Sequence, residues 1–277
     1  MTKNNSSRVL VNLLGVPTLL SIIFLGDTSF IPIFSLFIST IVLLGVKEIK
    51  SLVFSKGGEP SMPILIFFLL ILQCYRIFAD GIGIPVNNLI VGISFSAMIF
   101  EIFRKKKSPF FNVSITVFSF VWLGLMLGSL SELRNLPDIG FEITFIVFIS
   151  VWICDSAAFI FGKKYGKKKI LPDVSPNKTW LGTIAGFIST ILVLISIFKL
   201  NFLSSVFSIS DMIFIAIITG LIGQFGDWSE SLFKREAEIK DTSNILKGHG
   251  GILDRFDSLI FASPIVLIYC KYFILRG

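Results

Sequence analysis

The chain has 277 residues, of which 53% are hydrophobic and only 16% are charged, and its mean hydropathy is +0.85. These values exclude an ordinary water-soluble globular protein, whose surface needs far more charge. The formal net charge is +7. Nucleic-acid binding explains that charge poorly, because the basic residues follow the pattern expected of a membrane protein's topology.

Apolar runs close to the ~20 residues that cross a bilayer recur along the whole chain. We expect nine, at roughly 9–25, 30–46, 63–78, 86–103, 112–130, 141–161, 180–198, 212–225 and 258–275. The sequence therefore predicts an all-α, polytopic integral membrane protein with about nine transmembrane helices. The chain is expected to form a single membrane domain, with N-terminal spans over about 9–130 and C-terminal spans over about 138–275.

The distribution of basic residues predicts the orientation. If the N-terminus lies inside, the inner segments carry most of the 25 Lys and Arg residues, as the positive-inside rule requires. The two most polar loops, after the sixth and eighth spans, are then expected to face the cytoplasm. The first run follows Lys3 and Arg8 but has no small-x-small cleavage site, so we expect an uncleaved first helix.

Two kinds of small residue lie inside the apolar runs. Cys74, Cys154 and Cys270 show no metal-binding spacing, so they are expected to be small buried apolar side chains. Gly124 and Gly128 lie four residues apart in the fifth run, which predicts a helix-packing face.

The loop after the sixth span contains glycines and lysines. Only three residues separate Gly162 from Gly166, and Lys167 is followed by Lys168, so the loop is not a Walker A motif. The lysine run has two interpretations that stay open: it fixes topology beside anionic headgroups, or it binds substrate. Asp155, an acid at the membrane edge just before it, is either a functional residue or paired with a loop lysine.

A short Ser-Pro-x-Lys-Thr element opens the seventh run. Pro176 suits the first turn of a helix, with Ser175 as its cap. Free backbone N–H groups together with Lys178 and Thr179 would then form a site for phosphate oxygens.

The region from Asp227 to Asp257 holds the densest chemistry in the chain. On a helix, Asp227, Ser231 (or Glu230) and Lys234 share one face, and Asp254 and Asp257 share another. Carboxylates from two helix ends are the hard oxygen ligands that Mg²⁺ requires. Cations suited to a polyphosphate lie among them, and glycines let backbone amides approach an anion; these residues are Lys234, Arg235, Lys240, Arg255, Gly248, Gly250 and Gly251. His249, the only histidine, is either a buried hydrogen-bonded residue or part of this site.

The whole spacing resembles the C-terminal signature of the phosphatidate cytidylyltransferase family, also called CDP-diacylglycerol synthases. The signature reads Ser231-x-Phe-Lys-Arg-x4-Lys240-Asp241-x-Ser243-x2-Leu246-x2-His249-Gly-Gly-Ile-x-Asp254-Arg-Phe-Asp257. Two further blocks agree with the family, from Gln224 to Ser231 and from Asp155 to Trp180. There are two departures: Lys247 stands where the family usually has Pro, and Leu181 stands where it has Glu.

The resemblance implies that CTP and phosphatidate give CDP-diacylglycerol and pyrophosphate. It implies that Asp227 and Asp254 hold Mg²⁺, with Asp257 and Asp241 beside that ion or at a second cation. Lys234, Arg235, Lys240 and Arg255 would bind phosphates, and His249 would position a phosphate or stabilise its loop. The remaining expected substrate-binding residues are Asp155, Ser175, Lys178, Thr179, Ser231, Gly250 and Gly251.

Other functions are weighed beside this one. A related CTP-dependent enzyme acting on another lipid phosphate would share the metal site. A non-catalytic lipid carrier or transporter would also hold ionisable residues in its spans, but here they gather near one face. The expected partners are CTP, phosphatidate and the lipid bilayer, without nucleic acid, in a bacterial cytoplasmic membrane with the active site facing the cytoplasm. The sequence leaves a homodimer open.

Overall fold

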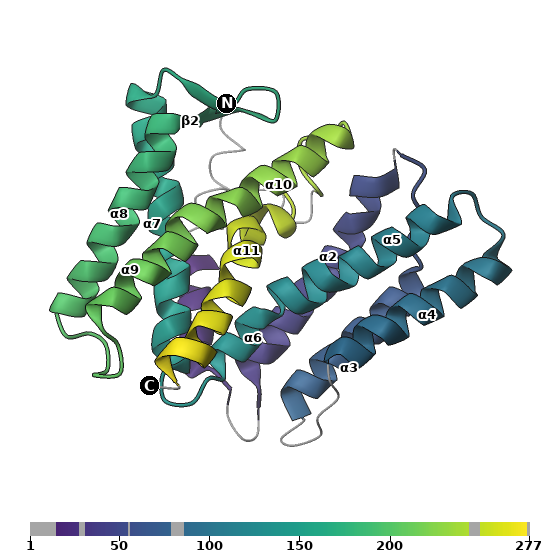
Figure 1. Cartoon of the computed structure of the whole chain (residues 1–277), viewed down its shortest axis with the longest axis horizontal. Helices are drawn as coiled ribbons and strands as arrows, with labels where there is room; N and C mark the ends of the chain where they lie inside the picture. Colours follow the sequence, from purple (N-terminus) through teal and green to yellow (C-terminus); the bar gives the residue numbers. More distant parts are fainter. Residues whose placement is uncertain (1–14, 28–30, 55, 79–85, 244–249, 276–277) are drawn as a thin grey trace. The chain divides into compact units, whose positions relative to one another are not determined.

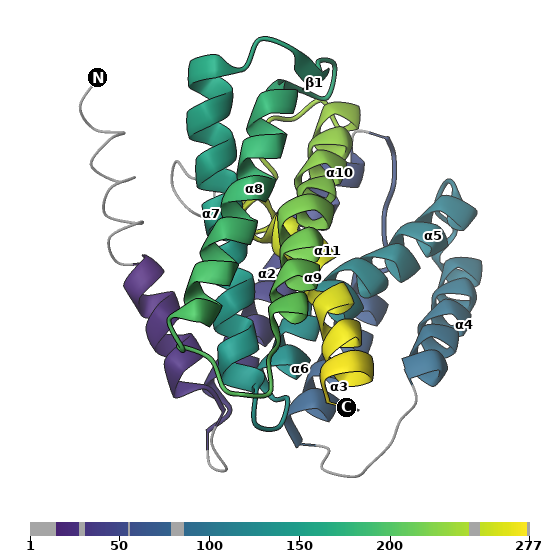
Figure 2. The same ribbon diagram turned by 60° about the vertical axis from the view of Figure 1, so that its left-hand side comes forward.

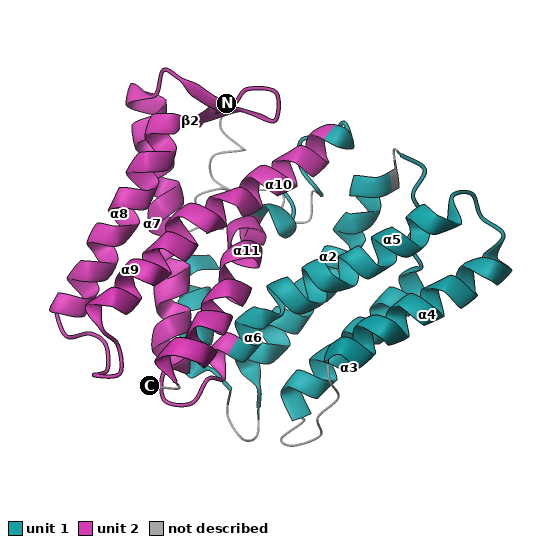
Figure 3. Cartoon of the chain, in the orientation of Figure 1, with its two compact units in different colours: residues 1–132, 236–254 teal, residues 133–235, 255–277 magenta. Residues whose placement is uncertain are grey.

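The computed structural model describes residues 15–27, 31–54, 56–78, 86–243 and 250–275 (Figure 1). Helices dominate, as the sequence predicts. The chain groups into two compact units, coloured separately in Figure 3. Unit 1 comprises residues 1–132 and 236–254, and unit 2 comprises residues 133–235 and 255–277. The polar region from Asp227 to Asp257 is therefore divided between the two units.

Unit 1 is built from apolar helices that pack against their neighbours in sequence. They are Gly15–Leu25, α2 (Ile33–Phe54), α3 (Met62–Phe78), α4 (Val86–Arg104), α5 (Pro109–Ser119), the π-helical segment η1 (Phe120–Leu127) and α6 (Ser129–Arg134), whose last two residues belong to unit 2. α2 packs on α3, and α4 packs on α5, as Figure 1 shows for the second pair. The core between them is aliphatic and aromatic, with Phe34, Leu65, Leu69 and Leu123 fully buried.

The expected packing face at Gly124 and Gly128 is confirmed. A Cβ at Gly124 would lie 2.8 Å from Leu69 of α3, and one at Gly128 would overlap the guanidinium of Arg76 on the same helix. The absence of side chains at these two positions therefore lets η1 lie directly against α3.

Unit 2 contains two long helices that pack side by side. α7 (Gly140–Tyr165) packs along α8 (Trp180–Lys199), which Figures 1 and 2 show side by side. Between them the chain forms an antiparallel hairpin of β1 (Lys169–Leu171) and β2 (Ser175–Thr179). The unit is completed by α9 (Ile209–Ile217), η2 (Ile218–Ile222), α10 (Gly223–Glu236), α11 (Leu253–Tyr269) and η3 (Cys270–Ile274). Glu236, Leu253 and Asp254, at the ends of α10 and α11, belong to unit 1.

Among the residues that the structure describes, six helices are long and apolar enough to span a bilayer, so the expected count of nine is not confirmed. The six are Val86–Arg104, Pro109–Arg134, Gly140–Tyr165, Trp180–Lys199, Ile209–Glu236 and Leu253–Ile274. Gly15–Leu25 and α3 are apolar but shorter. α2 has 22 residues, but Lys47, Glu48 and Lys50 place three charges near its end.

The expectation for the cysteines is correct for two of the three. Cys154 and Cys270 are buried, and the Cys154 thiol points to the Gly220 carbonyl at 3.4 Å. Cys74 is exposed, so the prediction that it is buried is wrong. An apolar run predicts a helix without saying which of its faces meets the core, and Cys74 lies on the outer face of α3.

In unit 1, the buried cation of Arg76 forms an ion pair with the carboxylate of Glu132. The Arg76 side chain is 4% exposed; its Nε and Nη2 lie 3.0 Å from Glu132 Oε1, and its Nη1 donates to the Gly124 carbonyl at 2.6 Å. Removing Glu132 would leave a charge with no counterion in an apolar interior.

We expect Glu132→Ala to lower the free energy of unfolding by about 3 kcal/mol, because a buried charge loses its partner. Thermal unfolding of the purified protein in detergent measures the change. The double variant Arg76→Met, Glu132→Ala removes both charges and should recover most of the loss. Glu236→Ala, at an exposed acid of the same unit, is the matched control. Equal effects of the Glu132 and Glu236 variants would contradict this account.

Candidate active site

The Ser-Pro-x-Lys-Thr element forms a strand, which corrects the expectation that it begins a helix. Ser175–Thr179 is β2, and α8 begins only at Trp180. Thr179 is the N-cap: its hydroxyl accepts a hydrogen bond from the Gly182 N–H at 3.1 Å. Ser175 pairs with Leu171 across the hairpin. Pro176 therefore occupies a position in a two-stranded hairpin, where its missing N–H is tolerated.

Glycines let the capped end of α8 lie directly against α7. A Cβ at Gly182 would come within 2.7 Å of the Ala158 carbonyl, and one at Gly162 would lie 3.0 Å from the Thr179 hydroxyl. A Cβ at Gly166 would overlap that hydroxyl. The glycines that suggest a phosphate loop in the sequence thus have a packing role, which fixes Thr179 and its neighbour Lys178.

Lys178 and Asp227 form an ion pair. Lys178 comes from β2 and Asp227 from α10, so the pair joins two of the sequence blocks that resemble the cytidylyltransferases. Both side chains are partly exposed, 23% for Lys178 and 31% for Asp227. The Lys178 ammonium also lies 5.9 Å from the centre of the Trp228 ring. An incoming phosphate would therefore find a positioned cation that keeps contact with water.

The face of α10 that the sequence predicts is confirmed. The Ser231 hydroxyl lies 3.4 Å from Asp227 Oδ1, and Lys234 Nζ lies 3.5 Å from Glu230 Oε2. Glu230 is fully buried and Lys234 is 8% exposed. Both spacings are one helical turn. The spacing predicts that Glu230 lies on this face. The expected site residues include its neighbour Ser231 instead, because Ser231 occupies the motif position.

Two further acids of unit 2 lie within range of the Asp227 charge. The charge of Asp227 acts on Asp155 of α7 and on Asp257 of α11, and Asp257 also feels the charge of Glu230. Gly226 brings α10 close to α11, because a Cβ there would overlap the Asp257 carbonyl. Asp155, Asp227, Glu230 and Asp257 thus form one acidic cluster, accompanied by the ammonium groups of Lys178 and Lys234.

Asp254 lies in unit 1, in the first turn of α11. Its Oδ2 atom accepts from the N–H of Gly251 at 2.7 Å and lies 3.2 Å from the N–H and 3.1 Å from the hydroxyl of Thr242. Gly250 has φ +78°, and a Cβ there would lie 2.7 Å from the same carboxylate oxygen. The two glycines of the motif therefore shape the backbone around Asp254.

The other expected residues are more dispersed. Arg235 is exposed, and its Nε donates to the Val174 carbonyl at 3.2 Å. Lys240, Asp241 and Arg255 are exposed as well. His249 and Lys247 lie outside the described residues. Within the described part of the chain, no three His, Cys, Asp or Glu side chains converge to hold a metal ion by themselves.

Comparison with known proteins decides the family. The model of the cytidylyltransferase family matches residues 6–273. The phosphatidate cytidylyltransferase of Bacillus subtilis (strain 168) is 33% identical over 271 residues, which cover 96% of this chain and 97% of the relative. The phosphatidate cytidylyltransferase of Staphylococcus haemolyticus is 30% identical over 94% of this chain and 97% of its own length.

The chain belongs to the cytidylyltransferase family. Membership covers nearly the whole length, so the N-terminal helices that carry no recognised motif are part of the family's architecture. The ion pair between Lys178 and Asp227 joins two of the family's sequence blocks within unit 2. Leu181, which departs from the family pattern, is exposed in the first turn of α8, 42% accessible.

One residue that the sequence did not indicate is Glu48, near the end of α2. It is 1% exposed and accepts hydrogen bonds from residues of the motif region. Between Lys47 and Lys50 it reads as an ordinary charged helix end. Its spacing from Gly45, three residues before it, and Leu52, four residues after it, is the only local signal that it faces inward.

Gly251 has no room for a side chain. A Cβ there would overlap the Thr242 hydroxyl and lie 2.6 Å from both carboxylate oxygens of Glu48. We expect Gly251→Ala to destabilise the protein by about 2 kcal/mol or more and to reduce activity strongly, because overpacking displaces the bonds to Asp254. Gly15→Ala is the matched control, since nothing lies within 4 Å of a Cβ there. Thermal unfolding and turnover measure both variants; a well-folded, fully active Gly251→Ala protein would contradict the prediction.

Proposed function

We propose that the chain transfers the cytidylyl group of CTP to phosphatidate, giving CDP-diacylglycerol and pyrophosphate in a cell membrane. Family membership over residues 6–273 and the names of relatives at 33% and 30% identity support this proposal. The observation that carries it within the structure is the Lys178–Asp227 ion pair, with Asp155 in electrostatic range. This ion pair joins two residues that lie more than forty positions apart in the sequence.

The chemistry requires little from a general base. The phosphate of phosphatidate is a monoester with a second pKa of about 6, so it is largely dianionic at neutral pH. One of its oxygens attacks the α-phosphorus of CTP, and the bond from that phosphorus to the β-bridging oxygen breaks. The bonding electrons leave with pyrophosphate. The protein must supply alignment and charge neutralisation.

Basic side chains supply part of that neutralisation. Lys178 has a fixed position in the hairpin and is partly open to solvent, so it can exchange its bond to Asp227 for one to a phosphate oxygen. We assign it to the phosphatidate headgroup, together with Ser175 and Thr179. Lys234, Arg235, Lys240 and Arg255 are assigned to the phosphates of CTP and to the departing pyrophosphate, and His249 to the same loop.

The acidic residues fit Mg²⁺. This ion is usually held by one or two carboxylates and completes its shell with water and substrate phosphates, so a set of three protein ligands is not required. The acidic cluster of unit 2 contains more carboxylates than ammonium groups, and Asp254 is oriented by its bonds to Gly251 and Thr242. We assign Asp227 and Asp254 as ligands, and Asp241 and Asp257 to groups that surround that ion or hold a second cation. When bound, the ion would neutralise triphosphate charge and polarise the α-phosphate.

The topology of the proposed enzyme follows from its apolar helices and its basic loops. In the described part of the chain, six helices satisfy the length and hydropathy of a membrane span, and the curated relatives are bacterial. We propose that the loop around the β1–β2 hairpin and the end of α10 face the cytoplasm, where CTP is available. Accessibility of a cysteine introduced at exposed Asn177 to a membrane-impermeant thiol reagent in intact cells would test this orientation.

We expect Asp227→Asn and Asp254→Asn to lower turnover at least about a hundredfold, because each removes an oxygen ligand and a charge. The assay uses purified protein in detergent with labelled CTP, Mg²⁺ and phosphatidate, and it follows both lipid-linked CMP and released pyrophosphate. Asp173→Asn, an exposed acid in the hairpin turn, is the control. Product formed only with a different lipid phosphate would favour a related CTP-dependent enzyme. No product from well-folded wild-type protein with any lipid phosphate would overturn the proposed function.

Lys178→Met should raise the KM for phosphatidate roughly tenfold, since a charged hydrogen bond to the phosphate is lost. The KM for CTP should change much less. Lys168→Met, an exposed lysine of the same loop, is the matched control and should behave like the wild type. Equal kinetic effects at the two lysines would show that Lys178 has no special part in headgroup binding.

A further inference from the structure

Glu48 is a buried carboxylate from a part of the chain that carries none of the family's motifs. It lies near the end of α2 and is 1% exposed. Burying an acid at this depth is costly unless its oxygens are well supplied with donors. Four donors meet it, and all four come from residues 242–253, about 200 positions later in the chain.

The four bonds are arranged symmetrically. Oε1 accepts from the Ser243 hydroxyl at 2.6 Å and the Ile252 N–H at 2.8 Å. Oε2 accepts from the Thr242 hydroxyl at 2.8 Å and the Leu253 N–H at 2.9 Å. Each oxygen thus holds one hydroxyl from before residues 244–249 and one amide from after them. A single carboxylate fixes both flanks of that segment.

The same bonds lead to Asp254. The Thr242 hydroxyl lies 2.8 Å from Glu48 Oε2 and 3.1 Å from Asp254 Oδ2. It has one proton and can donate to only one of the two carboxylates at a time. The Thr242 carbonyl lies 2.6 Å from the Ser51 hydroxyl of α2, which also lies 2.7 Å from the Glu48 carbonyl and has one proton for the two acceptors. Thr242 therefore couples the orientation of Asp254 to α2.

The N-terminal end of α11 strengthens this arrangement. Ile252 and Leu253 present backbone N–H groups at the start of a 17-residue helix, where negative charge is favoured. Gly251 admits no side chain between Glu48 and Thr242. Glu48 thus fixes the position and the direction of the helical turn that carries Asp254.

We propose that Glu48 is a positioning residue for Asp254: it holds Thr242 and the first turn of α11 so that the Asp254 carboxylate keeps the orientation needed for Mg²⁺ and CTP. This inference rests on the proposed function, which assigns Asp254 to the metal. It adds a residue of the N-terminal helices to the machinery of the reaction.

Glu48→Gln is the most direct test, because it keeps the shape of the side chain and replaces one acceptor oxygen by an NH2 group. An NH2 group cannot accept a hydrogen bond. Whichever oxygen is replaced, the N–H of Ile252 or Leu253 loses its partner. The orientation of Asp254 should then become less defined even where the fold survives.

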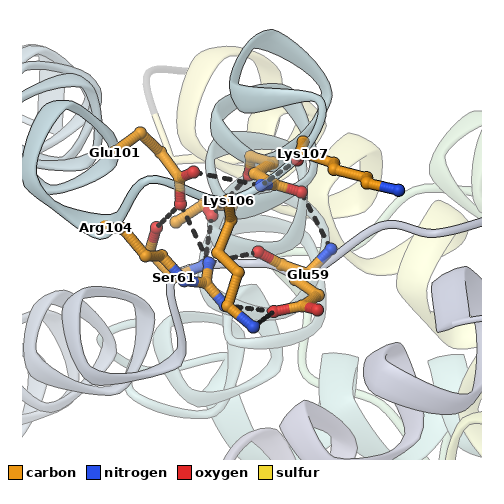
Figure 4. A network of polar contacts seen from close by, with 8 residues as sticks. Glu59, Ser61, Glu101, Arg104, Lys106 and Lys107 are labelled. Atoms are coloured by element: carbon orange, nitrogen blue, oxygen red, sulfur yellow. Dashed lines mark hydrogen bonds and ion pairs between the residues drawn. The ribbon is translucent and has the colours of Figure 1, made fainter.

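Glu101→Gln is the matched control, because Glu101 is also a buried acid of unit 1, 6% exposed. Figure 4 shows its surroundings: Oε1 accepts from Ser61 at 3.1 Å and Arg104 at 2.9 Å, and Oε2 accepts from Asn112 at 3.0 Å. These bonds involve no residue of 242–254. This variant measures how much stability and activity are lost when any buried, hydrogen-bonded Glu of this unit is replaced by Gln.

The experiment compares the two variants with wild type in detergent. For Glu48→Gln we expect the Mg²⁺ concentration for half-maximal rate and the KM for CTP to rise about tenfold, the loss expected for one buried hydrogen bond. The KM for phosphatidate should stay within about twofold. Hydrogen–deuterium exchange without substrate should accelerate in residues 250–256. Glu101→Gln should show none of these three changes.

Exchange in residues 250–256 does not depend on activity, so it separates the two hypotheses. If the wild type makes no product, the proposed function fails, while unchanged exchange in Glu48→Gln overturns the positioning inference. Equal loss of thermal stability in both variants, with unchanged Mg²⁺ and CTP dependence, would also overturn it.

If Glu48→Gln does not fold, Thr242→Val removes the bridging hydroxyl and should give the same Mg²⁺ and CTP shifts, whereas Thr242→Ser keeps it and should not. Identical behaviour of the two Thr242 variants would refute the coupling.

Discussion

The structure depends on the pairing of charged groups that lie at the ends of apolar helices, where unpaired charge is too costly to keep. Arg76 is held by Glu132, and Glu101 is held by Arg104 together with two neutral donors. Glu48 has four donors within hydrogen-bond distance and no cation, and it shares the Thr242 hydroxyl with Asp254. The contacts of Arg76 and Glu48, and those of Glu101 with Ser61 and Asn112, join residues of different segments. Satisfying these charges therefore also helps to fix which segments pack together.

Lys178 and Asp227 also pair opposite charges, but this ion pair remains in contact with water. Its two side chains stay partly exposed, so water and substrate phosphates can compete for them. The two carboxylates are similarly exposed, 33% for Glu132 and 31% for Asp227, but the cations differ: Arg76 is 4% exposed and Lys178 is 23% exposed. A buried cation resists the loss of its partner, whereas a cation at the water boundary can exchange its partner at small cost. The burial of the cation therefore separates the ion pair at Arg76 from the one that we assign to substrate binding.

Much of this architecture could be predicted from the sequence, because it follows from local periodicity. Helix periodicity predicted the shared face of Asp227, Ser231 and Lys234, and hydropathy predicted the helices themselves. The Ser175–Thr179 segment was misread because Ser-Pro is as compatible with a strand or turn as with a helix start. Only its pairing with β1, a tertiary contact, decides between them. The exposure of Cys74 has the same origin, since a run that is apolar on every side does not reveal its inward face.

Glu48 shows where such reasoning ends. A single Glu between two lysines near a helix end has only its spacing from Gly45 and Leu52 to distinguish it from a solvated charge, and its partners lie 194 to 205 positions away. The division of the chain into units explains why so distant a residue bears on the motif. Residues 236–254 group with the N-terminal helices, whereas Asp227 and Asp257 group with the C-terminal ones. A motif that is continuous in sequence is therefore divided between two structural units. Hydropathy alone predicts only that the N-terminal helices span the membrane. The structure shows that one of them also binds residues of the motif, through the carboxylate oxygens of Glu48.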